Sequence, residues 1–434
     1  MTPQASGEAG DPTAWLLARA AALSPREIDL GLERVAELLA RLGDPHQGMN
    51  FVQVAGTNGK GSTCAFLESM LRRAGWSTGL YTSPHLERFH ERIRVNGGEI
   101  ADAALGESLR CALEAGEGPP ALPATFFEWT TVAALDHFAR RRPDWTVLET
   151  GLGGRLDAVT VVTPRLCLIT PIALDHQAWL GASVERIAWE KAGILKPGVP
   201  CVADPGSPEA EGVIREAAAR VGAPLFLRGR DYHVARRGDG SWRFEDDAGS
   251  LDLPPPGLAG GHQYGNAALA LAGLRRLSLV PPPSHQALAE GVARVAWPGR
   301  LERFPGPPEC WLDGAHNPAA VRVLVEALRG LPAVPLVMVM GAFRDKEARE
   351  GIEALATLRD HGLQAAVVVT LEGERPAWSA EQLEAWWREA GTPVSIAADP
   401  ARALDEARQT AGRGGRVVVA GSLHLVGAVR SLLG

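Results

Sequence analysis

The chain has 434 residues, of which 46% are hydrophobic and 22% charged, with 49 glycines and 32 prolines. This balance excludes a wholly disordered protein and predicts two or three globular domains. The net charge of −7, without a Lys/Arg run, argues against non-specific nucleic-acid binding, although a few local cations suffice for an anionic small substrate.

The cysteines indicate a reducing compartment. Five are present, at positions 64, 111, 167, 201 and 310, and none belongs to a CxxC pair. An odd number without paired spacing predicts free thiols. No apolar signal segment follows Met1, and no apolar run reaches the roughly 18 residues needed to cross a membrane. We therefore expect a cytoplasmic protein without a membrane partner, with a monomer as the default state.

The N-terminal part alternates strand and helix patterns. A polar tail over 1–13 precedes helices within 14–42. The apolar face of these helices is formed by Leu32, Val35, Ala36 and Leu39. Strand patterns follow at 49–55, 77–82, 144–149, 166–172 and 199–203, and helix patterns at 62–74, 124–141 and 184–194. This alternation predicts βαβ units and a mainly parallel sheet.

The remainder of the chain predicts a hairpin and then a second α/β layer. A hairpin and loop are expected within 228–256, followed by a helix over 264–277. Trp297-Pro298-Gly299 interrupts the pattern, so we place the domain boundary near 298. Strand patterns then recur at 309–313, 335–340, 365–371, 394–397 and 416–420. The predicted fold is α/β, with domains at 1–297 and 298–434.

A glycine-rich loop, Gly56–Thr63 (GTNGKGST), joins a predicted strand to a predicted helix. Its glycines let backbone N–H groups face a phosphate, Lys60 supplies a point charge, and Ser62 or Thr63 can reach Mg²⁺. Gly61 separates Lys60 from Ser62, unlike in the standard P-loop. A plain glycine-rich turn is the alternative. Only four lysines stand among 44 basic residues, and this favours nucleotide binding.

Polar residues end other predicted strands, where α/β sheets place ligands. Glu149 suits Mg²⁺, with a capping or salt-bridged glutamate as the alternative. His176 follows Asp175 and could converge with Glu149 on one ion, although a lone structural histidine is the usual default. Ser83 could offer its hydroxyl, and a turn serine before proline is equally compatible. Lys191, beside a glutamate, could be an ordinary charge pair on a solvated face.

Three residues beyond the predicted boundary could contact a nucleotide. Arg300 lies just past the hinge and could swing onto phosphates. Asp313 and His316 follow a predicted strand and could hold ribose or phosphate. Asn317 before Pro318 also predicts a helix N-cap.

Together these motifs resemble the folate branch of the Mur ligase family, the dihydrofolate and folylpolyglutamate synthases. The matching segments, in the family's order, are IDLGLERV (28–35), AGTNGKGST (55–63), YTSPHL (81–86), ERIRVNG (91–97), TFFEWTT (125–131), LETGLGGRLDA (148–158), ALDH with WLG (173–181), EKAGILKPG (190–198), GGHQYGNA (260–267), PGRLE (298–302), LDGAHNP (312–318), RDKE (344–347) and GSLHLVG (421–427).

The resemblance implies two Rossmann-like domains: an N-terminal one with a P-loop ATPase-type parallel sheet and a smaller C-terminal glutamate ligase domain, with ATP between them. It implies an ATP-dependent carboxylate–amine ligase. ATP phosphorylates a substrate carboxylate, and the amine of L-glutamate attacks the acyl phosphate, giving an amide, ADP and phosphate. The implied partners are ATP with Mg²⁺, L-glutamate, and dihydropteroate, reduced folates or both.

The resemblance also implies residue roles. ATP is contacted by Asn58, Gly59, Lys60, Gly61, Ser62, Asn266, Arg300, Asp313 and His316. The Mg²⁺ ligands are Ser83, Glu149 and His176. The catalytic residues are Lys60, Glu149, His176 and Lys191, and Lys191 matches a lysine that carries a carbamate (N6-carboxylysine). The pterin side is formed by Asp29, Leu30, Thr125, Phe127, Glu128, Leu156, Asp157 and Ala158.

One departure and two alternatives remain. Where relatives usually read LDATN, this chain has Val159-Thr160 after Ala158, which affects the expected substrate preference more than the activity. A cell-wall Mur ligase is disfavoured by the LETGLGGRLDA and TSPHL segments. A non-catalytic ATP-binding regulatory module needs only the phosphate loop, not the other matching residues.

Overall fold

The computed structural model describes residues 12–24, 29–373 and 375–434. The polar tail expected over 1–13 lies outside this part of the chain, except that Pro12 and Thr13 already belong to helix α1 (Pro12–Leu23). The second predicted N-terminal helix is α2 (Glu33–Arg41). Val35, Leu38 and Leu39 form its buried face, and Ala36 is exposed. The prediction for Ala36 was wrong because it counted the helical period from Leu32, which is the N-cap of α2, whereas the buried face begins at Val35 and continues at i+3 and i+4.

An eight-stranded sheet forms the larger part of the molecule, in the order β4-β3-β2-β5-β1-β6-β7-β8. Its strands are β1 (Phe51–Ala55), β2 (Thr78–Tyr81), β3 (Ile93–Val95), β4 (Gly98–Glu99), β5 (Trp145–Glu149), β6 (Leu166–Ile169), β7 (Cys201–Ala203) and β8 (Leu225–Leu227). All its pairs are parallel except those of β3, with β2 and with β4. The strands that the sequence did not predict, β3, β4 and β8, are too short for a clear pattern.

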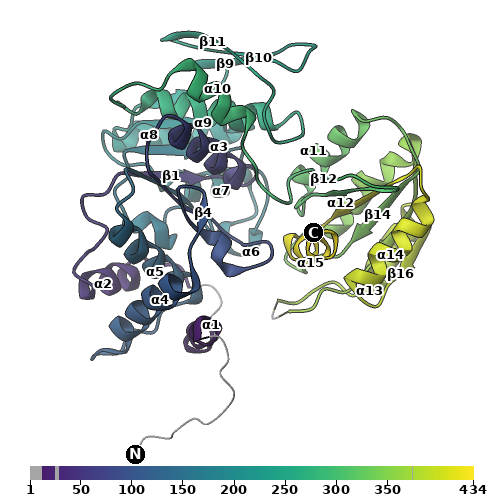
Figure 1. Cartoon of the computed structure of the whole chain (residues 1–434), viewed down its shortest axis with the longest axis horizontal. Helices are drawn as coiled ribbons and strands as arrows, with labels where there is room; N and C mark the ends of the chain where they lie inside the picture. The colour runs from purple at the N-terminus through teal and green to yellow at the C-terminus, as the bar shows by residue number, and fades with distance from the viewer. Residues whose placement is uncertain (1–11, 25–28, 374) are drawn as a thin grey trace, which may run out of the picture.

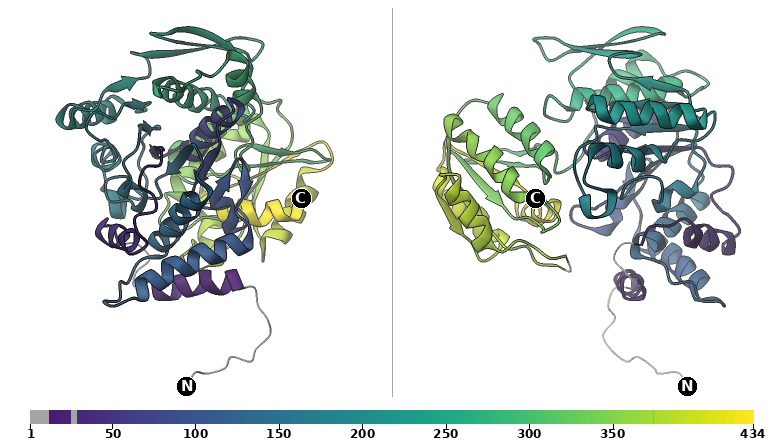
Figure 2. Two further views of the ribbon diagram at one scale, coloured as in Figure 1. Left: turned by 60° about the vertical axis from the view of Figure 1, so that its left-hand side comes forward. Right: turned by 180° about the vertical axis from the view of Figure 1, so that it is seen from behind.

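Helices cover both faces of this sheet (Figures 1 and 2). Alternate residues of β1 face different cores: Val52 and Val54 pack in the core that contains α3 and α9, and Phe51 packs in the core of α2, α4 and α5. The helices of this part, after α1 and α2, are α3 (Lys60–Arg73), α4 (Asp102–Glu117), α5 (Phe126–Arg141), α6 (Gln177–Leu180), α7 (Val184–Ala192), α8 (Pro208–Val221), α9 (Gln263–Arg276) and α10 (His285–Ala293). Short 3₁₀ helices lie at η1 (Phe89–Arg92) and η2 (Ala158–Val161).

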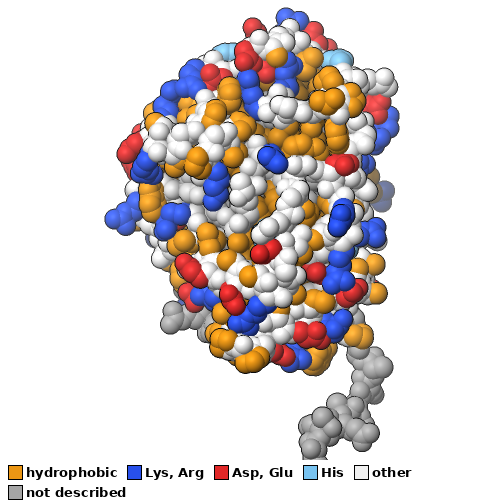
Figure 3. Space-filling view, turned by 90° about the vertical axis from the view of Figure 1, so that its left-hand side faces the viewer, with side chains coloured by type: hydrophobic (Ala, Val, Ile, Leu, Met, Phe, Trp, Pro, Cys, Tyr) orange, Lys and Arg blue, Asp and Glu red, His pale blue; other side chains and the backbone are white. Residues whose placement is uncertain are grey.

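The expected hairpin is part of a three-stranded antiparallel sheet, β9 (Tyr232–Arg236), β10 (Trp242–Asp246) and β11 (Gly249–Leu253). It lies at the top of Figure 1, where β9 and β10 pack on α9. On the face shown in Figure 3, acidic and basic side chains are interspersed. Within the described ranges, no helix is long and apolar enough to span a bilayer.

A third, six-stranded sheet has the order β12-β13-β17-β14-β15-β16. Its strands are β12 (Glu302–Phe304), β13 (Glu309–Leu312), β14 (Leu336–Met340), β15 (Leu363–Val368), β16 (Val394–Ile396) and β17 (Arg416–Ala420). Only the β12–β13 pair is antiparallel. The surrounding helices are α11 (Pro318–Arg329), α12 (Ala348–Ala356), η3 (Thr357–His361), α13 (Ala380–Glu389), α14 (Pro400–Ala411) and α15 (Leu423–Leu433).

The predicted α/β class is confirmed, with two parallel-rich sheets in one chain. No strand pair among the described residues joins the third sheet to the other two. The chain passes between these parts after α10, which ends at Ala293, and before Glu302. A domain boundary at 298 stays a prediction.

Candidate functional site

The phosphate loop follows β1 and leads into α3, as the sequence predicts. Gly59 is the N-cap of α3, with φ of +87°, a conformation that favours glycine. A Cβ at Gly56 would lie 1.8 Å from Thr170 Oγ1, so no larger residue fits there. The first turn of a helix leaves backbone N–H groups without intrahelical acceptors. Lys60, Gly61 and Ser62 occupy this turn and can therefore receive an anion.

Helix α9 supports the loop from behind. A Cβ at Gly59 would lie 2.5 Å from Asn266 Oδ1, so the two residues are in close contact. Gln263 Nε2 donates to Ser62 Oγ (3.5 Å), and its Oε1 accepts from Asn266 Nδ2 (2.8 Å). The structure therefore brings Asn266 and Ser62 together through Gln263, and their contacts with ATP stay predictions. Gln263 was missed, although it stands three residues before Asn266 in the GGHQYGNA segment.

Glu149 is a buried carboxylate at the carboxyl end of β5. It is 5% exposed, and its Oε2 accepts from the backbone N–H of Ser83 (3.2 Å). Burial raises its pKa, and the charges of Lys60 and Arg300 and the Ser83 hydrogen bond oppose the rise. No cationic side chain among the described residues forms an ion pair with it. A buried carboxylate with one backbone donor fits a divalent cation, because hard cations prefer oxygen ligands.

His176 does not end a strand. Strand β6 ends at Ile169, so Asp175 and His176 lie in the loop before α6. The expected strand over 166–172 was too long because Pro171 cannot donate a ladder hydrogen bond. His176 Nε2 lies 3.2 Å from Lys346 Nζ, and burial and the Lys346 charge lower its pKa to about 4. It is therefore a neutral imidazole whose lone pair faces a cation.

Convergence of Ser83, Glu149 and His176 on one ion stays a prediction. In the described ranges, no group of three or more His, Cys, Asp or Glu side chains is arranged to hold a metal. Such a site would depend on Ser83 or on ligand oxygens. Ser83 is held near Glu149 through its backbone N–H rather than its hydroxyl.

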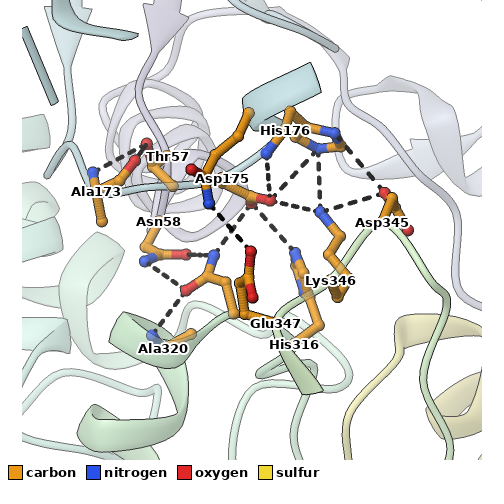
Figure 4. Close-up of polar contacts among 12 residues, drawn as sticks. Thr57, Asn58, Ala173, Asp175, His176, His316, Ala320, Asp345, Lys346 and Glu347 are labelled. Atoms are coloured by element: carbon orange, nitrogen blue, oxygen red, sulfur yellow. Dashed lines mark hydrogen bonds and ion pairs between the residues drawn. The ribbon is translucent and has the colours of Figure 1, made fainter. Parts of the chain in front are cut away.

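Asp175 is the centre of a polar network between the first and third sheets (Figure 4). Its Oδ1 pairs with Lys346 Nζ at 2.6 Å, and its Oδ2 accepts from Asn317 Nδ2 at 3.1 Å. Asn317 also exchanges hydrogen bonds with Asn58. Burial alone would raise the pKa of Asp175, but the neighbouring His316 imidazole, with Nε2 3.7 Å from Oδ2, and the Lys346 charge hold it well below its usual range.

The sequence pointed to part of this network only. Asn317 caps α11, as predicted, and its bridge to Asn58 was missed. Lys346 was not a predicted site residue. Two signals could have found it: the scarcity of lysine in the chain and the RDKE segment (344–347).

Lys191 is buried in α7, so a position on a solvated face is excluded. It is 4% exposed, and its Nζ donates to the backbone oxygen of Gly56 (2.6 Å). The neighbouring Glu190 pairs with Arg155 (3.0 Å) instead. Burial and the charge of Lys60 lower the pKa of Lys191 to about 7. A large fraction of this amine is therefore neutral and nucleophilic near neutral pH.

The predicted ATP contacts that follow the linker between α10 and β12 interact mostly with residues of their own part of the chain. Arg300 Nη1 donates to its neighbour Gly299 O (3.1 Å). Asp313 accepts from the backbone N–H groups of Leu301 and Ala315, both at 2.9 Å. His316 Nδ1 lies 2.7 Å from Gly314 O. ATP contacts of these residues stay predictions, with Arg300 the least engaged of the three.

The predicted pterin side is connected by an arginine that sequence analysis missed. Arg34 pairs with Asp29 (3.1 Å) and with Glu128 (2.9 Å). Thr125 and Glu128 cap α5 reciprocally. The Phe127 ring lies 6.1 Å from that of Tyr81. Leu30 and Leu156 are half-buried, and Ala158 is buried.

Asp157 and the departure from the family pattern form a buried turn. Asp157 accepts from the backbone N–H of Leu152 (2.7 Å) and of Val159 (3.1 Å), and burial raises its pKa to about 6. Thr160 Oγ1 donates to Gly154 O (2.6 Å) and accepts from Gln53 Nε2 (2.5 Å). The turn therefore depends on the threonine hydroxyl at the position where the chain departs from the expected family pattern.

Comparisons with known proteins identify related sequences. Residues 299–423 match the glutamate ligase domain of the Mur ligases. The chain is 38% identical to the dihydrofolate synthase/folylpolyglutamate synthase of Escherichia coli, over 100% of this chain and 97% of that protein.

Solved structures are also similar. One is the E. coli enzyme FolC in complex with DHPP and ADP (TM-score 0.90, 37% identity, 100% of this chain and 99% of that one). Another is the bifunctional Yersinia pestis enzyme with AMPPNP and Mn (TM-score 0.87, 36% identity, 100% of both chains). With nearly full coverage at this identity, the chain belongs to the dihydrofolate synthase/folylpolyglutamate synthase family of the Mur ligases.

Proposed function

We propose that this protein is an ATP-dependent ligase that adds L-glutamate to dihydropteroate, to reduced folates or to both. The observation that carries the proposal is a hydrogen-bond network that joins the phosphate loop to the C-terminal part of the chain. Asn317 Nδ2 donates to Asn58 Oδ1 (3.0 Å), and Lys346 Nζ donates to Asp175 Oδ1 (2.6 Å). A regulatory module that only binds ATP on the phosphate loop does not need this second part.

The residues support phosphoryl transfer followed by amide formation. Lys60 and the first N–H groups of α3 hold the β- and γ-phosphates, and Arg300 approaches them from the other side of the linker. The substrate carboxylate oxygen takes the γ-phosphoryl group and ADP leaves. The glutamate amine then attacks the acyl carbon, phosphate leaves with the C–O bonding pair, and the amine releases a proton. Positioning and charge neutralisation supply most of the rate.

Ser83, Glu149 and His176 would hold Mg²⁺, which when bound supplies positive charge to the phosphates. Two features of these residues suit a cation. Glu149 is buried with one backbone donor, and His176 is neutral. His176 must exchange its contact with Lys346 for the cation.

Lys191 is proposed to carry a carbamate. Its neutral amine would add to CO₂, forming an N–C bond and releasing one proton. The buried position beside Gly56 O and the pKa of about 7 support this reaction. The product is an anion with two acceptor oxygens close to the phosphate loop.

The pterin-side residues and the cellular setting complete the proposal. Phe127 offers a ring, and the Asp29–Arg34–Glu128 chain offers polar groups to a pterin.

We propose that the protein is located in the cytoplasm, because none of the five cysteines forms a disulfide. We also propose a monomer with domains at 1–297 and 298–434.

Product analysis tests this function. Purified protein is incubated with ATP, Mg²⁺ and L-glutamate, together with dihydropteroate in one series and tetrahydrofolate in another. The expected result is ADP release that requires glutamate and a pterin substrate, with a product heavier by one glutamyl residue. Turnover only with a UDP-linked sugar would favour a cell-wall ligase. ATP binding without glutamate-dependent ADP release would favour a regulatory module.

A further inference from the structure

A linker joins α10 to β12, and the upstream end of this linker contacts the phosphate loop. A Cβ at Gly61 would lie 2.9 Å from Trp297 Nε1 and 3.4 Å from its Cε2. The indole edge of Trp297 therefore packs directly on the first turn of α3. The guanidinium of Arg94 lies over the same ring, 5.2 Å from its centre. Trp297 is half-buried and packs against the core that contains α3 and α9.

The downstream end of the linker is attached to the loop that follows β13. Gly314 N donates to Gly299 O (2.9 Å), and Leu301 N donates to Asp313 Oδ2 (2.9 Å). Leu301 has φ of +45°, an unusual conformation for a branched side chain, which this hydrogen bond helps to hold. Two anchor points therefore lie on either side of Pro298.

Because these two anchor points are close together in the sequence, the linker restricts the distance between the phosphate loop and Arg300. Three extended residues span at most about 11 Å. Trp297 stands three residues before Arg300, so its seat on Gly61 limits how far Arg300 can lie from the phosphate loop.

We infer that Trp297 is a positioning residue, which couples the linker to the phosphate loop and thereby sets the affinity for ATP. The inference rests on the proposed function, because it requires Lys60 and Arg300 to contact one nucleotide. Trp297 is not proposed to touch a reacting atom. Its indole acts through Gly61 and through the backbone that leads to Arg300.

The surroundings of Trp297 indicate that neighbouring side chains would not fill the space left by a truncated indole. Trp297 lines a cavity of about 160 Å³ together with Leu80, Arg72 and Arg94. Truncation of the indole would enlarge this cavity, because close-packed neighbours relax only in part. The first turn of α3 would then lose its contact with the linker.

The first experiment compares two tryptophans of the same hydrophobic core. Trp297→Ala removes the contact with Gly61, and Trp76→Ala removes a similarly half-buried indole beyond the other end of α3. Affinities for ADP and for a non-hydrolysed ATP analogue are measured by calorimetry, with KM and kcat for each substrate and the melting temperature. Trp297→Ala should weaken nucleotide binding about tenfold or more and leave the KM of the pterin substrate unchanged.

Trp76→Ala should lower the melting temperature without changing nucleotide affinity. Trp297→Phe should restore most of the affinity, since a ring still reaches the loop, and it also serves if the alanine variant fails to fold. Equal nucleotide affinities in Trp297→Ala, Trp76→Ala and the wild type would overturn the inference. So would a loss of affinity in Trp76→Ala that matches the loss in Trp297→Ala.

A double-mutant cycle with Gly61→Ala tests the contact itself. Gly61 does not have a positive φ, so alanine is compatible with the backbone, and the nearest atoms to its Cβ belong to Trp297. Gly61→Ala should weaken nucleotide binding in the wild-type background and clearly less in Trp297→Ala. Equal losses in both backgrounds would overturn the coupling. Failure of the proposed function has a different signature: wild-type protein that binds nucleotide but forms no glutamyl product.

Discussion

The candidate ATP site has an upstream side, formed by residues before the linker between α10 and β12, and a downstream side, formed by residues after it. The two sides are built differently. On the upstream side, the charged groups have few partners: within the described residues, Lys60 Nζ donates only to Thr57 O, and Glu149 accepts only from Ser83 N. On the downstream side, both oxygens of Asp313 are used by backbone N–H groups. Upstream groups are therefore available to a ligand, and Asp313 maintains the shape of its loop. Similar motifs in the sequence thus correspond to different physical roles.

The largest expected effect is on the upstream side, at Lys60. Lys60→Ala should lower the rate of glutamyl transfer about a thousandfold, because a phosphate charge is left without its partner. Lys60→Arg should also fail, since a planar guanidinium does not fit the tight glycine turn. Rates are measured by ADP release, with circular dichroism to verify folding.

Lys196→Ala is the matched control for this prediction. Lys196 is half-buried and has no hydrogen-bond or ion-pair partner in the described structure, so its loss should leave the rate unchanged. Normal turnover in Lys60→Arg would contradict the interpretation of the loop.

Lys191 should show opposite effects on activity and stability. Lys191→Met should lose most activity, because methionine cannot form a carbamate. Its free energy of unfolding should rise by on the order of 5 kcal/mol below pH 7, since the wild type must bury an ammonium there. The folded-state pKa of about 7 lies below the ordinary value of 10.5, so wild-type stability rises with pH between these values.

The stability advantage of Lys191→Met should therefore shrink from pH 7 toward pH 10. Denaturant melts of both proteins in CO₂-free buffer at pH 6 and pH 9 measure this difference. A pH-independent difference would indicate a lysine with an unshifted pKa. Restoration of wild-type turnover by added bicarbonate, with no effect on the variant, would support the carbamate.

This contrast also explains how much the sequence could predict. Strand–helix alternation and the glycine loop depend on local residues, so the α/β class and the start of α3 were predictable. Partners such as Asp175 and Lys346 stand 171 residues apart, and only the fold brings them together. Arg34 was missed for the same reason: its partner Glu128 follows 94 residues later. Short strands such as β4 leave no periodic pattern.

Substitution of Lys346 tests the contact between the two sides, which its ion pair with Asp175 provides. Lys346→Met leaves Asp175 buried without its cation and should lower the free energy of unfolding by about 3–5 kcal/mol. The double variant with Asp175→Asn should recover part of this loss, because the unpaired charge is gone. Urea melts of the single and double variants measure the coupling. Additive losses would show that the pair does not interact in solution.

Arg300 and Asp313 should separate binding from structure on the downstream side. Arg300→Ala should raise the KM for ATP about tenfold with little change in melting temperature, because its contacts within the protein are few. Asp313→Ala should lower the free energy of unfolding by about 1–3 kcal/mol, since two backbone N–H groups lose their acceptor. Calorimetry and ATP kinetics on both variants distinguish the two roles. A loss of stability in Arg300→Ala together with a raised KM for ATP in Asp313→Ala would instead assign the structural role to Arg300 and the binding role to Asp313.

The smallest expected effect lies on the pterin side, at Thr160. Its hydroxyl bridges Gln53 and Gly154 in a turn where it is 2% exposed. Thr160→Val keeps the shape and removes the hydroxyl, so it should cost about 1–2 kcal/mol through an unsatisfied buried amide. Thr160→Ser keeps the hydroxyl and should cost less. Both should leave the KM for the pterin substrate unchanged, because the turn supports Asp157 from behind. A changed KM with unchanged stability would instead place Thr160 in contact with substrate.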